Sequence, residues 1–100
     1  MALKELTAKE VQEQLENGKA LHIIDVREDD EVAQGMIPGA THIALGDLPI
    51  EMHDLDQETP YILVCRSGGR SGRAQEIMAD EGFDVTNMTG GMLDWEGQTE

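Results

Sequence analysis

Residues 60–65 read Pro-Tyr-Ile-Leu-Val-Cys, and they constrain the fold more than any other stretch of the sequence. A short run that is apolar throughout is typical of a strand covered on both faces, as in a parallel sheet between two layers of helices. A loop with two adjacent glycines follows, and residues 71–81 then carry apolar side chains at helical spacing. This order of strand, loop and helix predicts an α/β domain with a mainly parallel sheet.

The other segments alternate in the same way. Residues 7–10 have the pattern of a capping box, which predicts a helix that begins after Thr7 and is closed by Gly18. Neither a linker nor a repeat interrupts the 100 residues, so we expect a single domain over residues 1–100. Further strands are predicted at residues 20–26, 42–45 and 83–88, short helices at 28–34 and after Gly90, a turn at 35–40, and a helical turn with a loop at 46–59.

The charge of the chain limits its partners. Twenty-one acidic and seven basic residues give a net charge of −14, which repels nucleic acids and anionic membrane surfaces. No apolar run approaches the roughly 20 residues of a membrane-spanning helix, and the first ten residues lack the apolar stretch of a secretory signal. We therefore expect a cytoplasmic protein that binds neither nucleic acid nor membranes.

The only cysteine lies where a strand gives way to a loop, a common place for ligand sites in parallel sheets. Glycines allow a tight curl in which backbone N–H groups converge on an anion, and the positive end of the next helix adds to this field. Such surroundings lower the pKa of a thiol, so we predict that Cys65 is a thiolate nucleophile. The residues predicted to bind substrate are Arg66, Ser67, Gly68, Gly69, Arg70 and Ser71.

Each of these features also has a purely structural interpretation. A lone cysteine in a cytosolic protein is often a small buried apolar group. Arg66, Arg70 and Arg73 fall within eight residues, and such a cluster often forms only surface ion pairs. The combination of glycines, arginines and strand–loop–helix context favours the chemical interpretation of Cys65.

Four motifs resemble the rhodanese-like family, and together they cover nearly the whole chain. Besides the Cys65 loop, Asp25-Val26-Arg27 with Glu31 is similar to the family's Asp-Val-Arg-x-x-x-Glu segment. Residues 35–40 resemble its Gly-His-Ile-Pro-Gly-Ala turn, with Met36 in place of the usual His, which we interpret as a packing variation. Residues 90–95 resemble its Gly-Gly-x-x-x-Trp segment.

This resemblance implies a rhodanese-like three-layer domain with a central five-stranded parallel sheet flanked by helices. It also implies that sulfane sulfur is transferred through a persulfide on Cys65. The donor would be a small anion such as thiosulfate or a persulfide, and the acceptor would be cyanide in the test tube or a thiol, free or on a protein.

Structural roles are expected for three residues near the site. An acid and a base two positions apart at a strand end more often fix a loop than perform chemistry, so we assign this role to Asp25 and Arg27. Glu31 is expected to pair with Arg27. No metal is expected, because the three histidines lack ligand spacing and there is no second cysteine, and no cofactor is expected, because a nucleotide-binding glycine motif is absent.

Two other functions compete with sulfur transfer. Cysteine phosphatases and arsenate reductases also use a cysteine loop with an arginine, but their loop places five residues between the two. Here four residues separate Cys65 from Arg70, and Ser71 stands at the phosphatase arginine position. The other alternative is a non-catalytic or carrier module whose acidic surface docks a partner protein.

Overall fold

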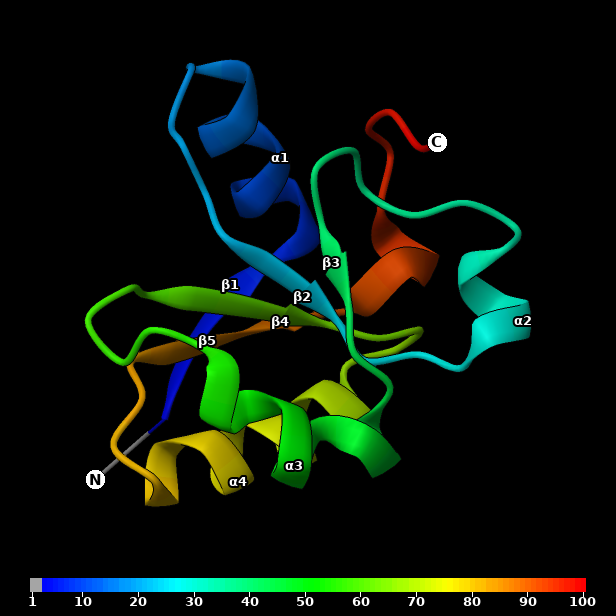
Figure 1. Ribbon diagram of the computed structural model, residues 1–100. Helices are drawn as coiled ribbons and strands as arrows, with labels where there is room; N and C mark the ends of the chain where they lie inside the picture. Colours follow the sequence, from blue (N-terminus) through cyan, green and yellow to red (C-terminus); the bar gives the residue numbers. More distant parts are fainter. Residues whose placement is uncertain (1–2) are drawn as a thin grey trace.

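The computed structural model describes residues 3–100, and at its centre lies a sheet of five strands (Figure 1). The order of the strands is β1-β5-β4-β2-β3, and every pair is parallel. All carboxyl ends therefore meet at one edge of the sheet, and β4, which leads into Cys65, is the middle strand. The strands are β1 (Lys4–Thr7), β2 (Ile23–Asp25), β3 (Thr41–His42), β4 (Tyr61–Val64) and β5 (Val85–Thr89).

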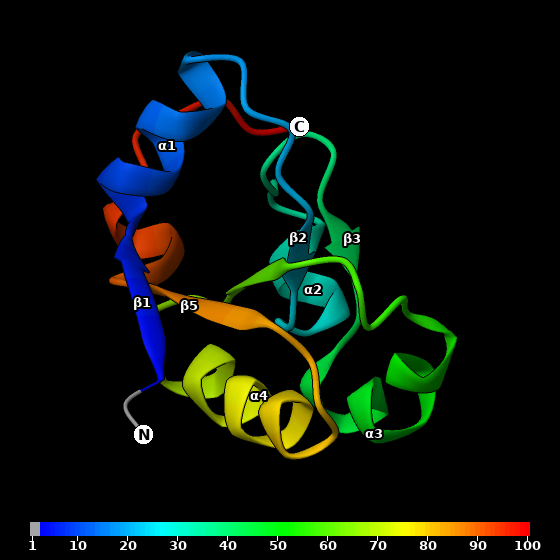
Figure 2. The same cartoon turned by 90° about the vertical axis from the view of Figure 1, so that its left-hand side faces the viewer.

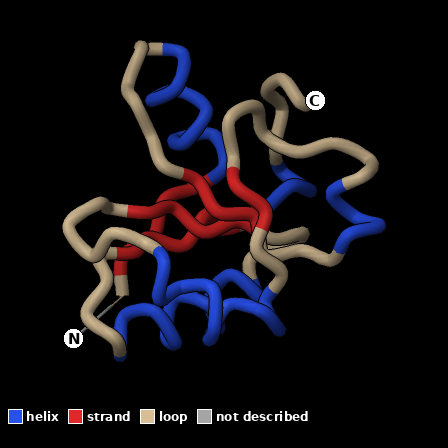
Figure 3. Tube along the Cα trace, in the orientation of Figure 1, coloured by secondary structure: helices blue, strands red, loops and turns tan. Residues whose placement is uncertain are grey.

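Helices cover both faces of the sheet, which gives the three predicted layers (Figures 2 and 3). On one face α4 (Gly69–Asp80) and α3 (Leu48–Glu51) enclose an apolar core that includes Leu63. On the other face α1 (Ala8–Glu16) and the 3-10 turn η3 (Gly91–Asp94) enclose a second core around Val64. The remaining helix, α2 (Asp29–Val32), follows β2 at the carboxyl edge. Within residues 3–100, no helix is long and apolar enough to cross a membrane.

Several local predictions are confirmed with shifted boundaries. The N–H of Glu10 donates to the Thr7 hydroxyl at 3.1 Å, and the N–H of Thr7 donates to the Glu10 carboxylate at 2.9 Å, so the capping box begins α1 as expected. The predicted helix at residues 71–81 begins earlier, at Gly69. The strand predicted at residues 20–26 is shorter, and residues 46–59 hold the end of the 3-10 turn η1 (Leu45–Asp47), α3 and the 3-10 turn η2 (Met52–Asp54).

One strand could not be recognised from its own residues. β1 has the sequence Lys-Glu-Leu-Thr and is largely exposed, so it shows no apolar run. Its position comes from pairing with β5, in which Leu6 lies opposite Met88. The expectation of five strands came from the family resemblance, and β1 is the strand that completes the count.

Candidate active site

The turn between β4 and α4 surrounds Cys65 with hydrogen-bond donors, and we call this arrangement, formed by residues 65–71, the cradle. Cys65 is buried, and its Sγ accepts a hydrogen bond from the N–H of Gly68 at 3.0 Å. The hydroxyl oxygen of Ser71, in the first turn of α4, lies 3.3 Å from the same sulfur. The backbone thus curls so that donors face one atom at the start of a helix, where the helix dipole also favours negative charge.

These donors determine the ionisation of the cysteine. Burial raises the pKa of the Cys65 thiol, since a buried charge loses hydration. Hydrogen bonds from the Ser71 hydroxyl and from the N–H groups of Ser71, Gly68 and Ser67 lower it by more. The pKa of the thiol therefore lies below its ordinary value, which favours the thiolate that nucleophilic attack requires.

The two glycines of the loop differ in what they contribute. Gly68 has a φ of +106°, in the region that side chains rarely adopt, and a Cβ there would stand 3.4 Å from the backbone N of Gly90. Gly69 has no such φ, and a Cβ built on it meets nothing within 4 Å. Only Gly68 is therefore required as glycine by the backbone.

We expect Gly68→Ala to lower the free energy of unfolding by about 1–3 kcal/mol, because the substituted residue is strained. Gly69→Ala is the matched control, and it should leave stability unchanged or slightly raised because alanine is the better helix former. Denaturant unfolding of both variants measures the difference. Equal losses would show that the curl at Gly68 does not need glycine.

The loop is fastened to the C-terminal segment. The carbonyl of Cys65 accepts the N–H of Met92 at 2.9 Å, and the carbonyl of Arg66 accepts the N–H of Leu93 at 3.0 Å. A Cβ on Gly91, which has a φ of +58°, would approach the Arg66 carbonyl oxygen to 2.4 Å. This close approach explains why a glycine stands at that position.

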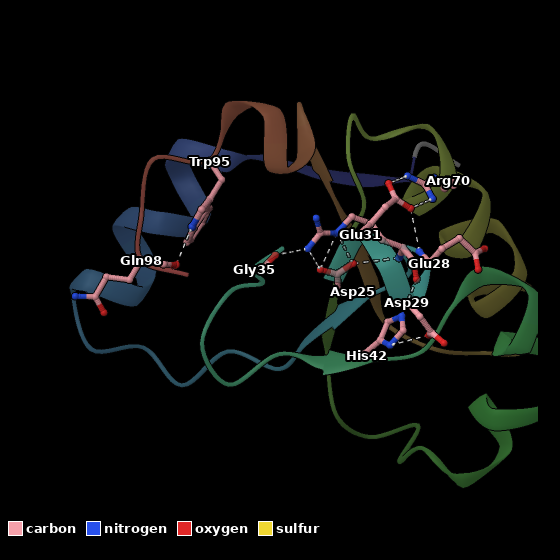
Figure 4. Close-up of polar contacts among 10 residues, drawn as sticks. Asp25, Glu28, Asp29, Glu31, Gly35, His42, Arg70, Trp95 and Gln98 are labelled. Carbon is pink, nitrogen blue, oxygen red and sulfur yellow. Dashed lines mark hydrogen bonds and ion pairs between the residues drawn. The ribbon is translucent and has the colours of Figure 1, made fainter. Parts of the chain in front are cut away.

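Asp25, which is labelled in Figure 4, forms a buried ion pair with Arg27 beside the loop. The Arg27 guanidinium donates to both carboxylate oxygens of Asp25 at 2.9–3.1 Å and to the Gly35 carbonyl at 2.7 Å. It thereby joins the end of β2 to the turn at residues 35–40. In that turn, Met36 exchanges two backbone hydrogen bonds with Glu100, at 3.0 and 2.9 Å.

The expected pairing of Glu31 with Arg27 is wrong. Glu31 instead accepts two hydrogen bonds from the Arg70 guanidinium, at 2.6 and 2.7 Å (Figure 4). Arg27 is already engaged by Asp25, whereas Arg70 reaches α2 from the first turn of α4. The Arg70 hydrogen bond and the N–H of Glu28 lower the pKa of Glu31 to about 2, against a smaller effect of burial. The Glu31 carboxylate therefore stays ionised at neutral pH.

The three clustered arginines do not act together. Arg73 pairs with Glu76 one helical turn away, on an exposed part of α4. The charge of Arg70 is balanced by Glu31, which in turn raises the pKa of Arg70. Arg66 is exposed, and within residues 3–100 no acidic group forms an ion pair with it. It lines a hollow of about 490 Å³, together with Arg27, Asp30, Glu31, Gln34, Met92 and Leu93.

One polar residue of the site was not foreseen. Asn87 lies in β5 and is only 6% exposed, and its side chain reaches both Ser71 and Gly68. Asparagine is disfavoured in strands, so its presence inside the predicted strand at residues 83–88 was an available signal. The structure thus brings Ser67, Gly68, Ser71 and Asn87 around Cys65, whereas Asp25, Arg27 and Glu31 support the neighbouring segments.

Comparisons with known proteins agree with this geometry. The family model described as "Rhodanese-like domain" matches residues 7–98. A Bacillus subtilis protein named "Putative sulfurtransferase YtwF" is 45% identical over all of this chain and 97% of its own length. "Putative sulfur carrier protein YrkF" of the same bacterium is 34% identical over 99% of this chain, which spans 54% of that relative. The crystal structure of a rhodanese-like domain protein from Staphylococcus aureus superposes with a TM-score of 0.92 at 33% identity, covering 98% of this chain and 97% of that one.

Proposed function

Because the chain belongs to the family of rhodanese-like domains, we propose that it is a sulfurtransferase that carries sulfane sulfur as a persulfide on Cys65. The observation that carries the proposal is the position of Sγ, which faces the Gly68 N–H at 3.0 Å and the Ser71 hydroxyl at 3.3 Å. A cradle of donors with a lowered thiol pKa suits a sulfur atom that alternates between thiolate and persulfide.

The proposed reaction has two steps. In the first, the Cys65 thiolate attacks the outer sulfur of a donor such as thiosulfate, an Sγ–S bond forms, and sulfite leaves with the electron pair of the broken S–S bond. In the second, a thiophilic acceptor attacks that outer sulfur, the Sγ–S bond breaks, and its electron pair returns to Sγ as thiolate. Cyanide would leave as thiocyanate, and a thiol would leave as a persulfide. The chain's own groups hold the sulfur and stabilise charge in both steps, and we propose that it works in the cytoplasm.

Intact-mass measurement tests the proposal. Incubation with thiosulfate should add one sulfur atom to the protein, and cyanide should remove it with release of thiocyanate. A protein that stays unmodified by thiosulfate and by low-molecular-weight persulfides would contradict sulfur transfer. Hydrolysis of an aryl phosphate is not expected, since four residues rather than five separate Cys65 from Arg70, and the Arg70 guanidinium is engaged by Glu31.

A carrier that hands sulfur to a dedicated protein is the second candidate, favoured by the likeness to the sulfur carrier relative. Both functions require sulfur to be loaded onto Cys65, so the rate at which sulfur is released to different acceptors distinguishes them. An enzyme that serves small acceptors turns over rapidly with cyanide or a small thiol. A carrier loads once, discharges slowly to small acceptors, and turns over only with its protein partner.

Arg66 should assist the binding of an anionic donor, because it is the exposed cation at the hollow beside the loop of a protein with a net charge of −14. Arg66→Ala should raise the KM for thiosulfate roughly two- to fivefold, the effect of losing an exposed charge contact. Arg70→Ala should raise it further, since it also leaves the Glu31 carboxylate without its partner. Steady-state kinetics at low salt, where screening is weak, measures both.

Arg73→Ala is the matched control for this charge change. Arg73 lies on the same helix as Arg70, but it pairs with Glu76 away from the hollow, so its loss should leave KM nearly unchanged. KM values equal to that of the wild type in the Arg66, Arg70 and Arg73 variants would show that these arginines do not assist donor binding.

A further inference from the structure

Ser71 and Asn87 form a buried chain of polar groups that ends at Sγ. The Ser71 hydroxyl oxygen is 3.3 Å from Cys65 Sγ and 2.5 Å from the Asn87 side-chain oxygen. The Asn87 amide nitrogen donates to the Gly68 carbonyl at 3.1 Å. Ser71 and Cys65 are at most 1% exposed and Asn87 is 6% exposed, so these contacts are shielded from solvent.

The orientation of the Asn87 amide fixes which group donates. The Gly68 carbonyl only accepts hydrogen bonds, so the amide nitrogen must face it, and the amide oxygen must face Ser71. That oxygen also only accepts, so at 2.5 Å the proton between the two side chains belongs to Ser71. A hydroxyl has a single proton to donate, so while the Ser71 hydroxyl donates to Asn87 it cannot also donate to Sγ.

Two arrangements of the protons satisfy the hydrogen bonds among Cys65, Ser71 and Asn87, and they differ in the charge on Sγ. When Cys65 is a thiol, its S–H donates to Ser71 and the Ser71 hydroxyl donates to Asn87. When Cys65 is a thiolate, the Ser71 hydroxyl turns to Sγ, because a hydrogen bond to a charged acceptor is about twice as strong as a neutral one. The free energy by which the Ser71 hydroxyl stabilises the thiolate is then reduced, because its hydrogen bond to Asn87 is lost.

We propose that Asn87 is a positioning residue that holds the Ser71 hydroxyl proton while Sγ is uncharged and gives it up when Sγ becomes a thiolate. In the sulfur transfer proposed above, Sγ is uncharged in the persulfide and becomes a thiolate when the outer sulfur leaves. Asn87 would thus hold the Ser71 hydroxyl close to Sγ while the persulfide is present, without a hydrogen bond from this hydroxyl to Sγ. The Asn87 amide also donates to the carbonyl of Gly68, the residue whose N–H donates to Sγ.

A double-mutant cycle on the thiol tests this role. The proteins are the wild type, Ser71→Ala, Asn87→Leu and the double variant, and the measurement is the pKa of Cys65 from thiolate absorbance and from the pH dependence of alkylation by iodoacetamide. The charged groups near Cys65 are the same in all four: Arg66 on the loop, Arg70 on α4, Glu31 on α2, and the Asp25–Arg27 pair after β2. Any loosening of Gly68 by Asn87→Leu is present in both Asn87 variants and cancels in the comparison.

Ser71→Ala should raise the pKa of Cys65 by about half a unit when Asn87 is present, and by about one to two units in the Asn87→Leu background, where Sγ has no competitor for the hydroxyl. An equal or smaller shift in the Asn87→Leu background would overturn the proposal, since a residue that only packs the core would lower the melting temperature without this coupling. If Asn87→Leu does not fold, Asn87→Val, which suits a strand, gives the same comparison. The cycle needs no sulfur transfer, so its failure is distinct from a failure of the proposed function.

Discussion

Cys65→Ala should abolish both sulfur loading from thiosulfate and release of thiocyanate with cyanide. The chain has a single cysteine, so no other thiol can form a persulfide in its place. Alanine removes only the Sγ atom from the buried position, and the variant should therefore stay folded. Intact mass and a thiocyanate assay measure the two steps, and a melting curve establishes that the variant is folded.

Lys9→Ala is a suitable control for this variant, because Lys9 is exposed on α1 and is not part of the cradle. It should load and discharge sulfur as the wild type does. Wild-type turnover by Cys65→Ala would refute the mechanism. Loss of turnover in Lys9→Ala would point to damage unrelated to the site.

Breaking the Asp25–Arg27 ion pair should produce the largest loss of stability. Asp25 is 1% exposed and Arg27 is 7% exposed, so Arg27→Ala leaves a buried carboxylate without its partner. Removal of one partner from such a pair costs about 3–5 kcal/mol, a large part of the 5–15 kcal/mol typical of a whole domain. For a chain of this length, each kcal/mol lowers the melting temperature by roughly 4–8 °C. Calorimetry should therefore record a fall of more than about 12 °C.

Two further variants separate the buried charge from other causes. Lys4→Ala removes an exposed partner of Asp84 and should change stability by at most about 1 kcal/mol. The double variant Asp25→Leu with Arg27→Met replaces both charges with apolar groups and should lose less than Arg27→Ala alone. A double variant less stable than Arg27→Ala would show that the pair itself, and not the orphaned charge, is what matters.

Local signals in the sequence predict much of the domain and the centre of its site. The apolar run of β4, the capping box at Thr7 and the glycines after Cys65 each act within a few residues, and the structure contains the elements that they predict. The contacts that were missed join distant segments. β1 depends on a strand some eighty residues away, Arg70 reaches Glu31 on another helix, and Asn87 meets Ser71 across the sheet–helix interface. Geometry of this kind follows from the packing of the whole chain.

The hydrogen bonds from Met92 and Leu93 to the carbonyls of Cys65 and Arg66 bear on how substrates are recognised. They join the loop to the C-terminal turn, so we expect the loop to stay closed unless this turn also opens. The cradle is thus preorganised, and little conformational entropy remains to be lost when a sulfur compound binds. For the proposed sulfur transfer, we therefore expect discrimination between donors and acceptors to come from the shape and charge of the surface around the loop, where Arg66 and Leu93 are exposed, and not from closure of the loop.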